Sequence, residues 1–348
     1  MKSAIITIND YDNYGNRLQN YALQKALENV GCDVDTIDFQ DEISKSVNLN
    51  IWLYNLINYK KDPQRRFRLF KNFTKDNINV IKKKSDYVNT NNYDLFVCGS
   101  DQIWNPDFAG FNYYFGSFVP KNKLFSYAAS FGVDSVDGDY REKCKKLLER
   151  FSVISVRENS GASIIREITN QNVVCNVDPT LLLDKNDWKL LEKKPNYTVP
   201  SKYIFVYFLG EQSKEVKTYI KKLSLSLNCE VIGLKGKDRD KIWYETGPSE
   251  FLWLMDHSYA VVTDSFHGTV FSVIFNKPVV ISNRIDSRKS MGSRIDSLLS
   301  VLDLKGRRME ELQIENVMAY DYSNCYKNLQ IQKEISYNYL KTIIISER

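Results

Sequence analysis

The sequence predicts an α/β protein made of two Rossmann-like domains and a C-terminal closing helix. Its 348 residues are enough for about two domains. Short apolar runs alternate with amphipathic segments, which is typical of strand–helix–strand units around a parallel sheet. The pattern stops at a polar stretch and then restarts. We therefore expect one Rossmann-like domain over residues 1–190, a second over 191–310, and a helical segment, 311–348, that packs back on the first domain.

The first domain is expected to open with a strand, a loop, a helix and a second strand. Residues 4–8 are apolar and β-branched, as in the central strands of parallel sheets. Residues 16–30 carry an apolar stripe at helical spacing, and Gly31 ends this helix before the strand 33–39. Further strands are expected at 93–98, 124–130, 153–156 and 173–177, and helices at 140–151 and 161–169.

The second domain is expected to follow a linker, residues 184–202, which is polar and contains Pro195 and Pro200. The apolar run 203–209 restarts the alternation of strands and helices. Further strands are expected at 230–234, 259–263 and 277–281, helices at 214–227, 250–255, 269–275 and 293–302, and a Tyr- and Ile-rich closing helix at 325–345.

The composition favours a folded protein that keeps its thiols reduced. Hydrophobic residues make up 43% and charged residues 26%, which provides for a packed core. The six cysteines are scattered and form no C-x-x-C pair, as in cytoplasmic proteins. The first apolar run is too short for a signal peptide, and no apolar run reaches the roughly 18 residues that span a membrane. We therefore expect a cytoplasmic location.

The net charge of +5 is unevenly distributed. Residues 60–84 hold ten Lys or Arg and two Asp, a net charge of +8, so the rest of the chain carries −3. Phe67, Phe70 and Phe73 lie among these charges. Such a segment is either a surface that meets an anionic membrane or an ordinary solvated helix face.

Five polar loops directly follow expected strands, at 9–17, 99–105, 155–158, 178–180 and 264–269. Ligands of open α/β sheets bind at the carboxyl ends of the strands. Five such loops in a chain with 15 glycines predict a shared cleft that the two domains face.

His267 is the sharpest catalytic candidate in these loops. It follows the expected strand 259–263, and histidine titrates near neutral pH, where it can transfer protons. Gly268 and Thr269 place backbone N–H groups at a helix start, which favours an anion. The alternative is a histidine that caps a packed turn. The other histidine, His257, precedes a buried strand and is expected to be structural.

Two arginines are candidates for holding an anion, because a guanidinium grips carboxylates and phosphates bidentately. Arg157 follows the expected strand 153–156, and the alternative is an ion pair with Glu158 or Glu167. Arg294 opens an expected helix, and the alternative is a surface position.

Several site classes are absent from the sequence. Loop 9–17 lacks the G-x-G-x-x-G pattern of dinucleotide sites, and there is no Walker A or G-x-S-x-G pattern. Two histidines cannot build a typical zinc site. We therefore expect no cofactor and no bound metal. Asp101 is a candidate for binding a sugar hydroxyl, although capping a helix is its default role.

The chain resembles the polysaccharide pyruvyl transferase family through an ordered set of short motifs. They are N-Y-G-N at 13–16, G-S-D-Q-I-W at 99–104, S-Y-A-A-S at 126–130, S-V-R-E at 155–158, D-P-T-L-L at 178–182, D-S-F-H-G at 264–268 and G-S-R-I at 292–295. Each motif is weak alone, and their order along nearly the whole chain makes the set specific.

The resemblance implies a cytoplasmic transferase of capsule or exopolysaccharide biosynthesis with the two-domain architecture of GT-B glycosyltransferases. Such an enzyme moves a pyruvyl group from phosphoenolpyruvate to a sugar of a surface polysaccharide or its lipid-linked precursor, and forms a pyruvate ketal. A lipid-linked acceptor would bring residues 60–84 to the inner face of the membrane.

The resemblance and the chemistry together assign roles to the candidates. The catalytic residues are expected to be His267 and Arg157. The donor-binding residues are expected to be Ser265, Gly268, Thr269 and Arg294. The acceptor-binding residues are expected to be Asn13, Gly15, Asn16, Ser100, Asp101 and Gln102.

Three other functions stay open at this point. A glycosyltransferase with a nucleotide-sugar donor would share the architecture. A non-catalytic sugar- or anion-binding module would not need a proton-transferring His267. A nucleic-acid-binding protein is supported by residues 60–84 alone, and we expect no nucleic-acid partner.

Overall fold

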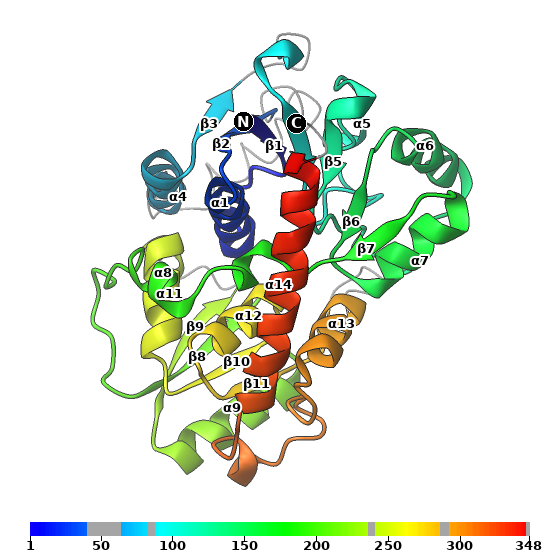
Figure 1. The fold of residues 1–348 in the computed structure, drawn as a ribbon. Helices are drawn as coiled ribbons and strands as arrows, with labels where there is room; N and C mark the ends of the chain where they lie inside the picture. Colours follow the sequence, from blue (N-terminus) through cyan, green and yellow to red (C-terminus); the bar gives the residue numbers. More distant parts are fainter. Residues whose placement is uncertain (40–63, 83–87, 236–240, 286–291, 346–348) are drawn as a thin grey trace. The chain divides into compact units, whose positions relative to one another are not determined.

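The computed structural model describes residues 1–39, 64–82, 88–235, 241–285 and 292–345. The chain divides into two compact units (Figure 1). The first comprises Met1–Leu182 with Gln332–Arg348, and the second comprises Leu183–Ile331. The structure divides the chain after Leu182 and after Ile331, whereas the sequence predicted boundaries after residues 190 and 310.

The first unit is built on a parallel sheet of the Rossmann type. Its strand order, β3-β2-β1-β4-β5, has β1 at the centre, where Ala4 pairs with Asp35 on one side and Phe96 on the other. The strands are β1 (Lys2–Ile6), β2 (Asp33–Asp38), β3 (Val80–Lys82), β4 (Leu95–Cys98) and β5 (Leu124–Ser126).

Two further strands, β6 (Ile154–Val156) and β7 (Val173–Cys175), pair with each other. A parallel bridge joins Ala129, which follows β5, to Val156 of β6, so β6 comes next to β5 in the strand order. The helices of the unit are α1 (Tyr14–Asn29), α4 (Gln64–Asn77), α5 (Phe111–Tyr114), α6 (Gly138–Leu148) and α7 (Asn159–Ile168), with 3-10 turns at Thr90–Asn92, Lys121–Lys123 and Pro179–Leu181.

Aromatic packing fills the core of the first unit. Trp104 is fully buried and its ring stacks on Phe115 at a centroid distance of 5.1 Å, with Phe131 at 5.4 Å. Rings of this size bury large apolar areas, which fixes the chain that follows β4 against the rest of the unit.

The second unit holds a four-stranded parallel sheet with the order β11-β10-β8-β9. Its strands are β8 (Tyr203–Phe208), β9 (Glu230–Lys235), β10 (Ala260–Thr263) and β11 (Val279–Ile281). Its helices are α8 (Lys185–Lys189), α9 (Lys214–Leu227), α10 (Lys241–Tyr244), α11 (Pro248–His257), α12 (Phe266–Ile274) and α13 (Gly292–Leu302), with a 3-10 turn at Ile314–Asn316.

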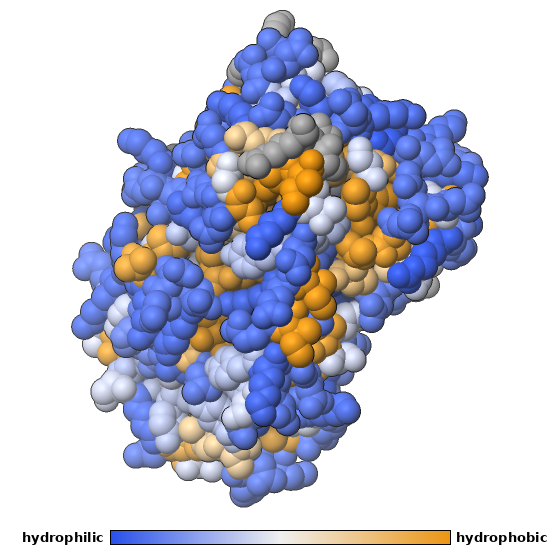
Figure 2. All heavy atoms as spheres, viewed as in Figure 1, coloured by the Kyte–Doolittle hydropathy of each residue, from blue (hydrophilic) through white to orange (hydrophobic). Residues whose placement is uncertain are grey.

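The closing helix α14 (Ser323–Ile345) begins in the second unit and ends in the first (Figure 1). Figure 2 shows hydrophobic surface along part of this helix, where Ile331 is 54% and Ile335 46% exposed. Within the part of the chain that the structure describes, no helix combines the length and the hydrophobicity that crossing a membrane requires.

The predicted α/β class with two Rossmann-like domains is confirmed by the five-stranded parallel sheet of the first unit and the four-stranded parallel sheet of the second. The element boundaries differ in places. The predicted strand 124–130 ends at Ser126, because the backbone turns where Ala128 adopts a positive φ of 46°. The short strand β3 was not predicted, because its three residues lie in a stretch dominated by lysine.

Candidate functional site

The first unit has a topological switch point between β1 and β4. The chain runs from β1 to β2 on one side of the sheet and returns to β4 on the other, and crevices for ligands open at such points. The loops at this edge are tied together. Thr7 donates to the Ser100 carbonyl oxygen at 3.2 Å, and the Ser100 N–H donates to Gln19 Oε1 at 3.2 Å.

The predicted acceptor-binding residues meet at this edge. Asn13 caps α1 by accepting the Asn16 N–H, and Asn16 Nδ2 donates to Asp101 Oδ2 at 2.9 Å. Asp101 also accepts the Gln102 N–H at 2.8 Å. Ser100 is fully buried, and Gly15 is buried in the first turn of α1. The structure thus brings all six predicted residues around the ends of β1 and β4.

Three carboxylates of the switch point, Asp10, Asp38 and Asp101, lie near the buried guanidinium of Arg17. Burial lowers the pKa of Arg17, although these negative charges act against it. Burial raises the pKa of Asp10, and the charges of Asp12 and Asp101 add to this effect. The edge therefore carries more carboxylates than cations, which suits a ligand that donates hydrogen bonds.

Arg157 is fully enclosed by carboxylates. Its Nη1 lies 2.7 Å from Asp178 Oδ2, its Nε 3.8 Å from Glu158 and its Nη2 4.0 Å from Asp101. Burial alone would lower the pKa of Arg157, but the charges of Asp178, Glu158 and Asp101 raise it. Glu167, one of the two ion-pair partners considered from the sequence, binds Arg141 instead, at 2.6 Å.

Asp178 was not among the site residues predicted from the sequence. It belongs to the D-P-T-L-L motif at 178–182, which contributed to the family resemblance. Besides Arg157, it accepts Ser100 Oγ at 3.3 Å and Thr180 Oγ1 at 2.6 Å. A carboxylate directly after a strand was the available signal. The predicted catalytic role of Arg157 stays a prediction, and its guanidinium is already engaged by Asp178.

The second unit has its own switch point, between β8 and β10. Asp264 follows β10 and accepts the backbone N–H groups of Leu209 and Gly210, each at 2.8 Å, from the end of β8. Burial raises the pKa of Asp264, although these two hydrogen bonds lower it. A side chain on Gly210 would lie 2.7 Å from the Ile285 carbonyl oxygen, so the loops after β8 and β11 touch here.

His267 lies in the first turn of α12 at this edge. Its side chain is buried and its ring meets Phe266 edge-on, with centroids 5.2 Å apart. Ser265 is the N-cap of the helix. The structure therefore brings His267 and the predicted donor-binding residues Ser265, Gly268 and Thr269 to the end of β10.

The amides of Gly268 and Thr269 are used within this turn. The Gly268 N–H donates to Ser265 Oγ at 3.3 Å, and the Thr269 N–H donates to the Ser265 carbonyl oxygen at 3.0 Å. In addition, a side chain on Gly268 would lie 2.4 Å from Thr263 Oγ1, so this glycine allows α12 to pack on β10. Both N–H groups therefore already have an acceptor on Ser265, and their predicted role in binding an anion stays a prediction.

Two arginines add positive charge to the second unit. Arg294 is 8% exposed in α13, which packs on α12, so the surface position considered from the sequence is wrong. Arg284 follows β11, and its charge lowers the pKa of Asp264. Sequence reasoning missed Arg284, although it too comes directly after a strand.

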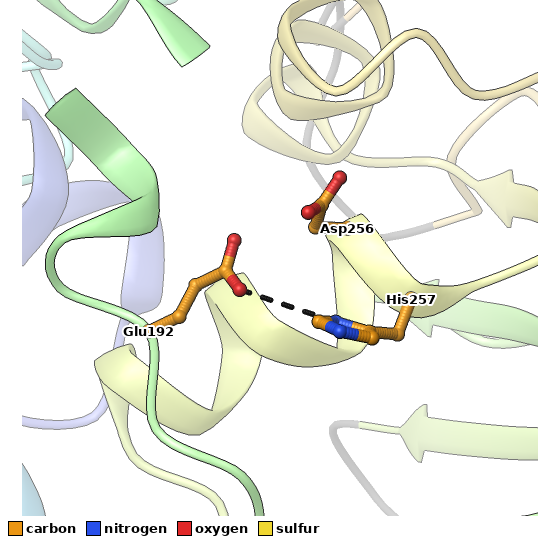
Figure 3. A group of neighbouring side chains, drawn as sticks. All are labelled: Glu192, Asp256 and His257. Atoms are coloured by element: carbon orange, nitrogen blue, oxygen red, sulfur yellow. Dashed lines mark ion pairs between the residues drawn. The ribbon is translucent and has the colours of Figure 1, made fainter. Parts of the chain in front are cut away.

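One group of possible metal ligands, Glu192, Asp256 and His257, occurs among the described residues (Figure 3). Glu192 points toward His257, with Oε2 3.9 Å from Nδ1. Lys185 and Lys189 bind the two carboxylate oxygens of Asp256 at 3.0 and 3.1 Å. His257 Nδ1 also lies 2.9 Å from the Trp253 carbonyl oxygen, which requires a proton on that nitrogen. The two lysine contacts of Asp256 and the hydrogen bond of His257 Nδ1 all disfavour a metal ion at this group.

The same group predicts a pH-dependent stability. Burial and the charge of Asp256 raise the pKa of Glu192 from 4.5 to about 7. The folded protein thus keeps this proton to a higher pH than the unfolded chain. The stabilisation is complete below pH 4.5 and is lost as the pH rises through 7. We expect Glu192→Gln to flatten this decline in urea unfolding between pH 4.5 and 7, and parallel curves for both proteins would contradict it.

Comparison with known proteins identifies the family. A sequence model described as polysaccharide pyruvyl transferase matches residues 13–287, most of the chain. The chain belongs to the polysaccharide pyruvyl transferase family. The resemblance carried by the short motifs is thereby confirmed. The matched span of this pyruvyl transferase family member includes every predicted site residue except Arg294.

Three solved structures with a similar chain course have low sequence identity to this chain. A UDP-GlcNAc 2-epimerase of Methanocaldococcus jannaschii is 15% identical, with a TM-score of 0.48 over 95% of this chain and 92% of that one. A putative UDP-N-acetylglucosamine 2-epimerase of Listeria monocytogenes is 11% identical, with a TM-score of 0.47 over 96% and 90%. The ADP-heptose lps heptosyltransferase II of E. coli is 11% identical, with a TM-score of 0.39 over 96% and 99%. No curated protein sequence matches the chain.

Proposed function

We propose that this family member transfers a pyruvyl group from phosphoenolpyruvate to a sugar of a surface polysaccharide or its lipid-linked precursor. The product is a pyruvate ketal across two hydroxyls of the sugar. The observation that carries the proposal is the position of His267 at the switch point of the second unit, in a family of pyruvyl transferases.

The second unit is the proposed donor site because the charge of Arg284 acts on Asp264 at the switch point where His267 lies. Phosphoenolpyruvate carries a carboxylate and a phosphate, and Arg284 and Arg294 supply two guanidinium groups on elements around α12. His267 is proposed to donate a proton to the methylene carbon of phosphoenolpyruvate. The neighbouring carbon then becomes an oxocarbenium-like electrophile, two sugar hydroxyls add to it, and phosphate leaves.

The first unit is the proposed acceptor site because its switch point is rich in carboxylates. An anionic donor would be repelled by Asp10, Asp38 and Asp101, whereas these carboxylates accept hydrogen bonds from the hydroxyls of a neutral sugar. Asn13, Asn16 and Gln102 add amide groups of the kind that bind sugar hydroxyls. In this proposal Arg157 shapes the acceptor site through Asp178 rather than holding the donor.

Phosphoenolpyruvate is expected to stabilise the purified protein against heat, because a ligand that binds the folded state raises its apparent stability. At a concentration about 100 times the Kd the gain is about 2.7 kcal/mol. Thermal unfolding of the wild type, Arg284→Ala and the surface control Lys305→Ala, 88% exposed at its side chain, measures this. We expect the shift in the wild type and in Lys305→Ala, and its loss in Arg284→Ala. A shift with UDP and none with phosphoenolpyruvate would instead indicate a glycosyltransferase with a nucleotide-sugar donor.

Contact with the inner face of the membrane is proposed for the exposed side of α4. Residues 60–63, 83 and 84 of the basic stretch lie outside the described residues. Within α4, Phe70 and Phe73 are buried, whereas Phe67 is 42% exposed and Lys71 lies over its ring at 4.4 Å. One exposed aromatic among lysines fits a weak, electrostatic contact with anionic lipid. Flotation with phosphatidylserine vesicles should show binding that salt abolishes, and absence of binding at low salt would contradict the contact.

A further inference from the structure

Helix α4 packs along α1 in the first unit (Figure 1). The ring of Phe70 contacts that of Tyr14 with centroids 5.3 Å apart, and Phe73 contacts Tyr21 with centroids 6.3 Å apart. Both phenylalanines are buried, so these contacts form an apolar interface between the two helices. The interface places the first turn of α4 beside residues 9–13, the loop that leads into α1.

Arg66, in the first turn of α4, binds this loop. The residue is 3% exposed. Its Nε binds the Asp12 carboxylate, and its Nη2 donates to the Asp12 carbonyl oxygen at 2.7 Å. Its Nη1 donates to the hydroxyl of Tyr14, the first residue of α1, and the guanidinium lies 4.4 Å from the centre of that ring. One side chain thus holds the side chain and the backbone of Asp12 against the start of α1.

The residue that Arg66 holds directly precedes the predicted acceptor-binding residues. Asn13 is the N-cap of α1 and accepts the Asn16 N–H at 3.2 Å. Asn16 in turn donates to Asp101 at 2.9 Å. Because Asp12 and Asn13 share a peptide bond, the position of the Asp12 carbonyl group limits where Asn13 can lie. Arg66 therefore acts on the acceptor-binding residues through Asp12.

The contacts of Arg66 require an arginine. An apolar side chain would also pack on Tyr14, as Phe70 does, but it would not bind a carboxylate and a carbonyl oxygen. The planar guanidinium presents several N–H groups in a fixed fork and also stacks on aromatic rings. Arg66 was counted from the sequence in a basic surface stretch, and its burial corrects this. The side chain is built to position Asp12 rather than to face solvent.

We propose that Arg66 is a positioning residue that fixes the loop 9–13 in the arrangement that binds the acceptor sugar. The inference rests on the proposed function, which takes the first unit as the acceptor site. Without the guanidinium, the loop populates several arrangements, and the acceptor binds only the fraction that has Asn13 and Asn16 in place. The apparent affinity for the acceptor falls by this fraction, whereas the turnover of bound acceptor stays the same.

Steady-state phosphate release from phosphoenolpyruvate tests this role, with the methyl glycosides of glucose, galactose and mannose as acceptor probes. We expect Arg66→Gln to raise the acceptor KM by about tenfold or more, with kcat and the KM for phosphoenolpyruvate within about threefold of the wild type. Arg66→Lys keeps the charge without the fork and should give an intermediate acceptor KM. Arg68→Gln changes an exposed arginine of the same helix and should behave as the wild type. A fall in kcat with an unchanged acceptor KM overturns the proposal.

Two further variants distinguish positioning from a general loss of stability. Phe73→Leu loosens the other end of the interface between α4 and α1, so it should lower the free energy of unfolding and leave the acceptor KM unchanged. The double variant Arg66→Gln with Asp12→Asn should have the acceptor KM of Arg66→Gln alone, because both changes break the same contact. If the two single effects multiply, Arg66 does not act through Asp12.

Hydrogen exchange tests the proposal without turnover, and it decides the proposal if none of the probe sugars is converted. We expect the amides of residues 9–17 to exchange about tenfold faster or more in Arg66→Gln than in the wild type, and those of β4 to stay unchanged. Equal exchange in residues 9–17 overturns the proposal. If the wild type converts a nucleotide sugar and no phosphoenolpyruvate, the proposed function fails, and the raised acceptor KM is then expected in that transfer reaction.

Discussion

Replacing His267 with glutamine is expected to lower kcat by about 1,000-fold. Glutamine keeps much of the volume and polarity of histidine but cannot donate a proton as a general acid, and such catalysis contributes about 10²–10⁴ in rate. His267 lies at the first turn of α12, at the switch point of the second unit, where the donor is proposed to bind. Steady-state phosphate release measures the loss.

His257→Gln is the matched control, because the chain has two histidines. His257 stacks on Trp253 with centroids 4.0 Å apart, at the end of α11. We expect its substitution to leave kcat within a few-fold of the wild type. Retention of phosphoenolpyruvate-induced stabilisation in His267→Gln would show that the loss is catalytic. Near-full turnover of His267→Gln would remove the proton-donor role.

Most strands, and the polar residues that directly follow them, could be predicted from the sequence alone. Apolar runs such as 4–8 and 259–263 are typical of buried parallel strands, and polar residues directly after them fall at the carboxyl edge of a sheet whatever the strand order is. That is why Asn16, Asp101 and His267 could be selected without knowing which strands are neighbours. The observed orders then place them at the two switch points.

Partners across the sheet could not be predicted, because they depend on strand pairing. Arg157 follows β6 and Asp178 follows β7, and the register that pairs Val156 with Cys175 brings them to the same edge. Nothing local to either residue states that β6 and β7 are adjacent. The sequence therefore pointed to the near neighbour Glu158, which does pair with Arg157 at 3.8 Å, but it did not indicate the closer partner Asp178, 21 residues away.

The helical spacing of Arg66 indicates that it is buried, whereas a count of the charges over residues 60–84 does not. Arg66, Phe70 and Phe73 are spaced as i, i+4 and i+7, which places them on one face of a helix. All three are buried. A count of positive charge over 60–84 treats Arg66 as one cation among ten, whereas the helical spacing separates it from Arg68 and Lys71 on the exposed face.

Asp178→Ala is expected to destabilise the first unit by about 3–5 kcal/mol. The side chain of Asp178 is fully buried, and that of Arg157 is 1% exposed. Removing the carboxylate leaves a buried guanidinium without its closest counter-charge, which is far more costly than the loss of one hydrogen bond. It also takes away the acceptor of Ser100 and Thr180. Urea unfolding measures the change, with hydrogen exchange in residues 153–182 as the local readout.

Two further variants test whether the unpaired buried charge, rather than a loss of packing, destabilises Asp178→Ala. Glu167→Ala breaks the pair with Arg141, whose side chains are 65% and 33% exposed, and should cost at most about 1 kcal/mol. The double variant Arg157→Met with Asp178→Leu removes both charges and keeps apolar volume, so it should be more stable than Asp178→Ala. If the double variant is less stable than Asp178→Ala, the buried charge is not the cause, and the carboxylate acts mainly by joining the loops that follow β4 and β7.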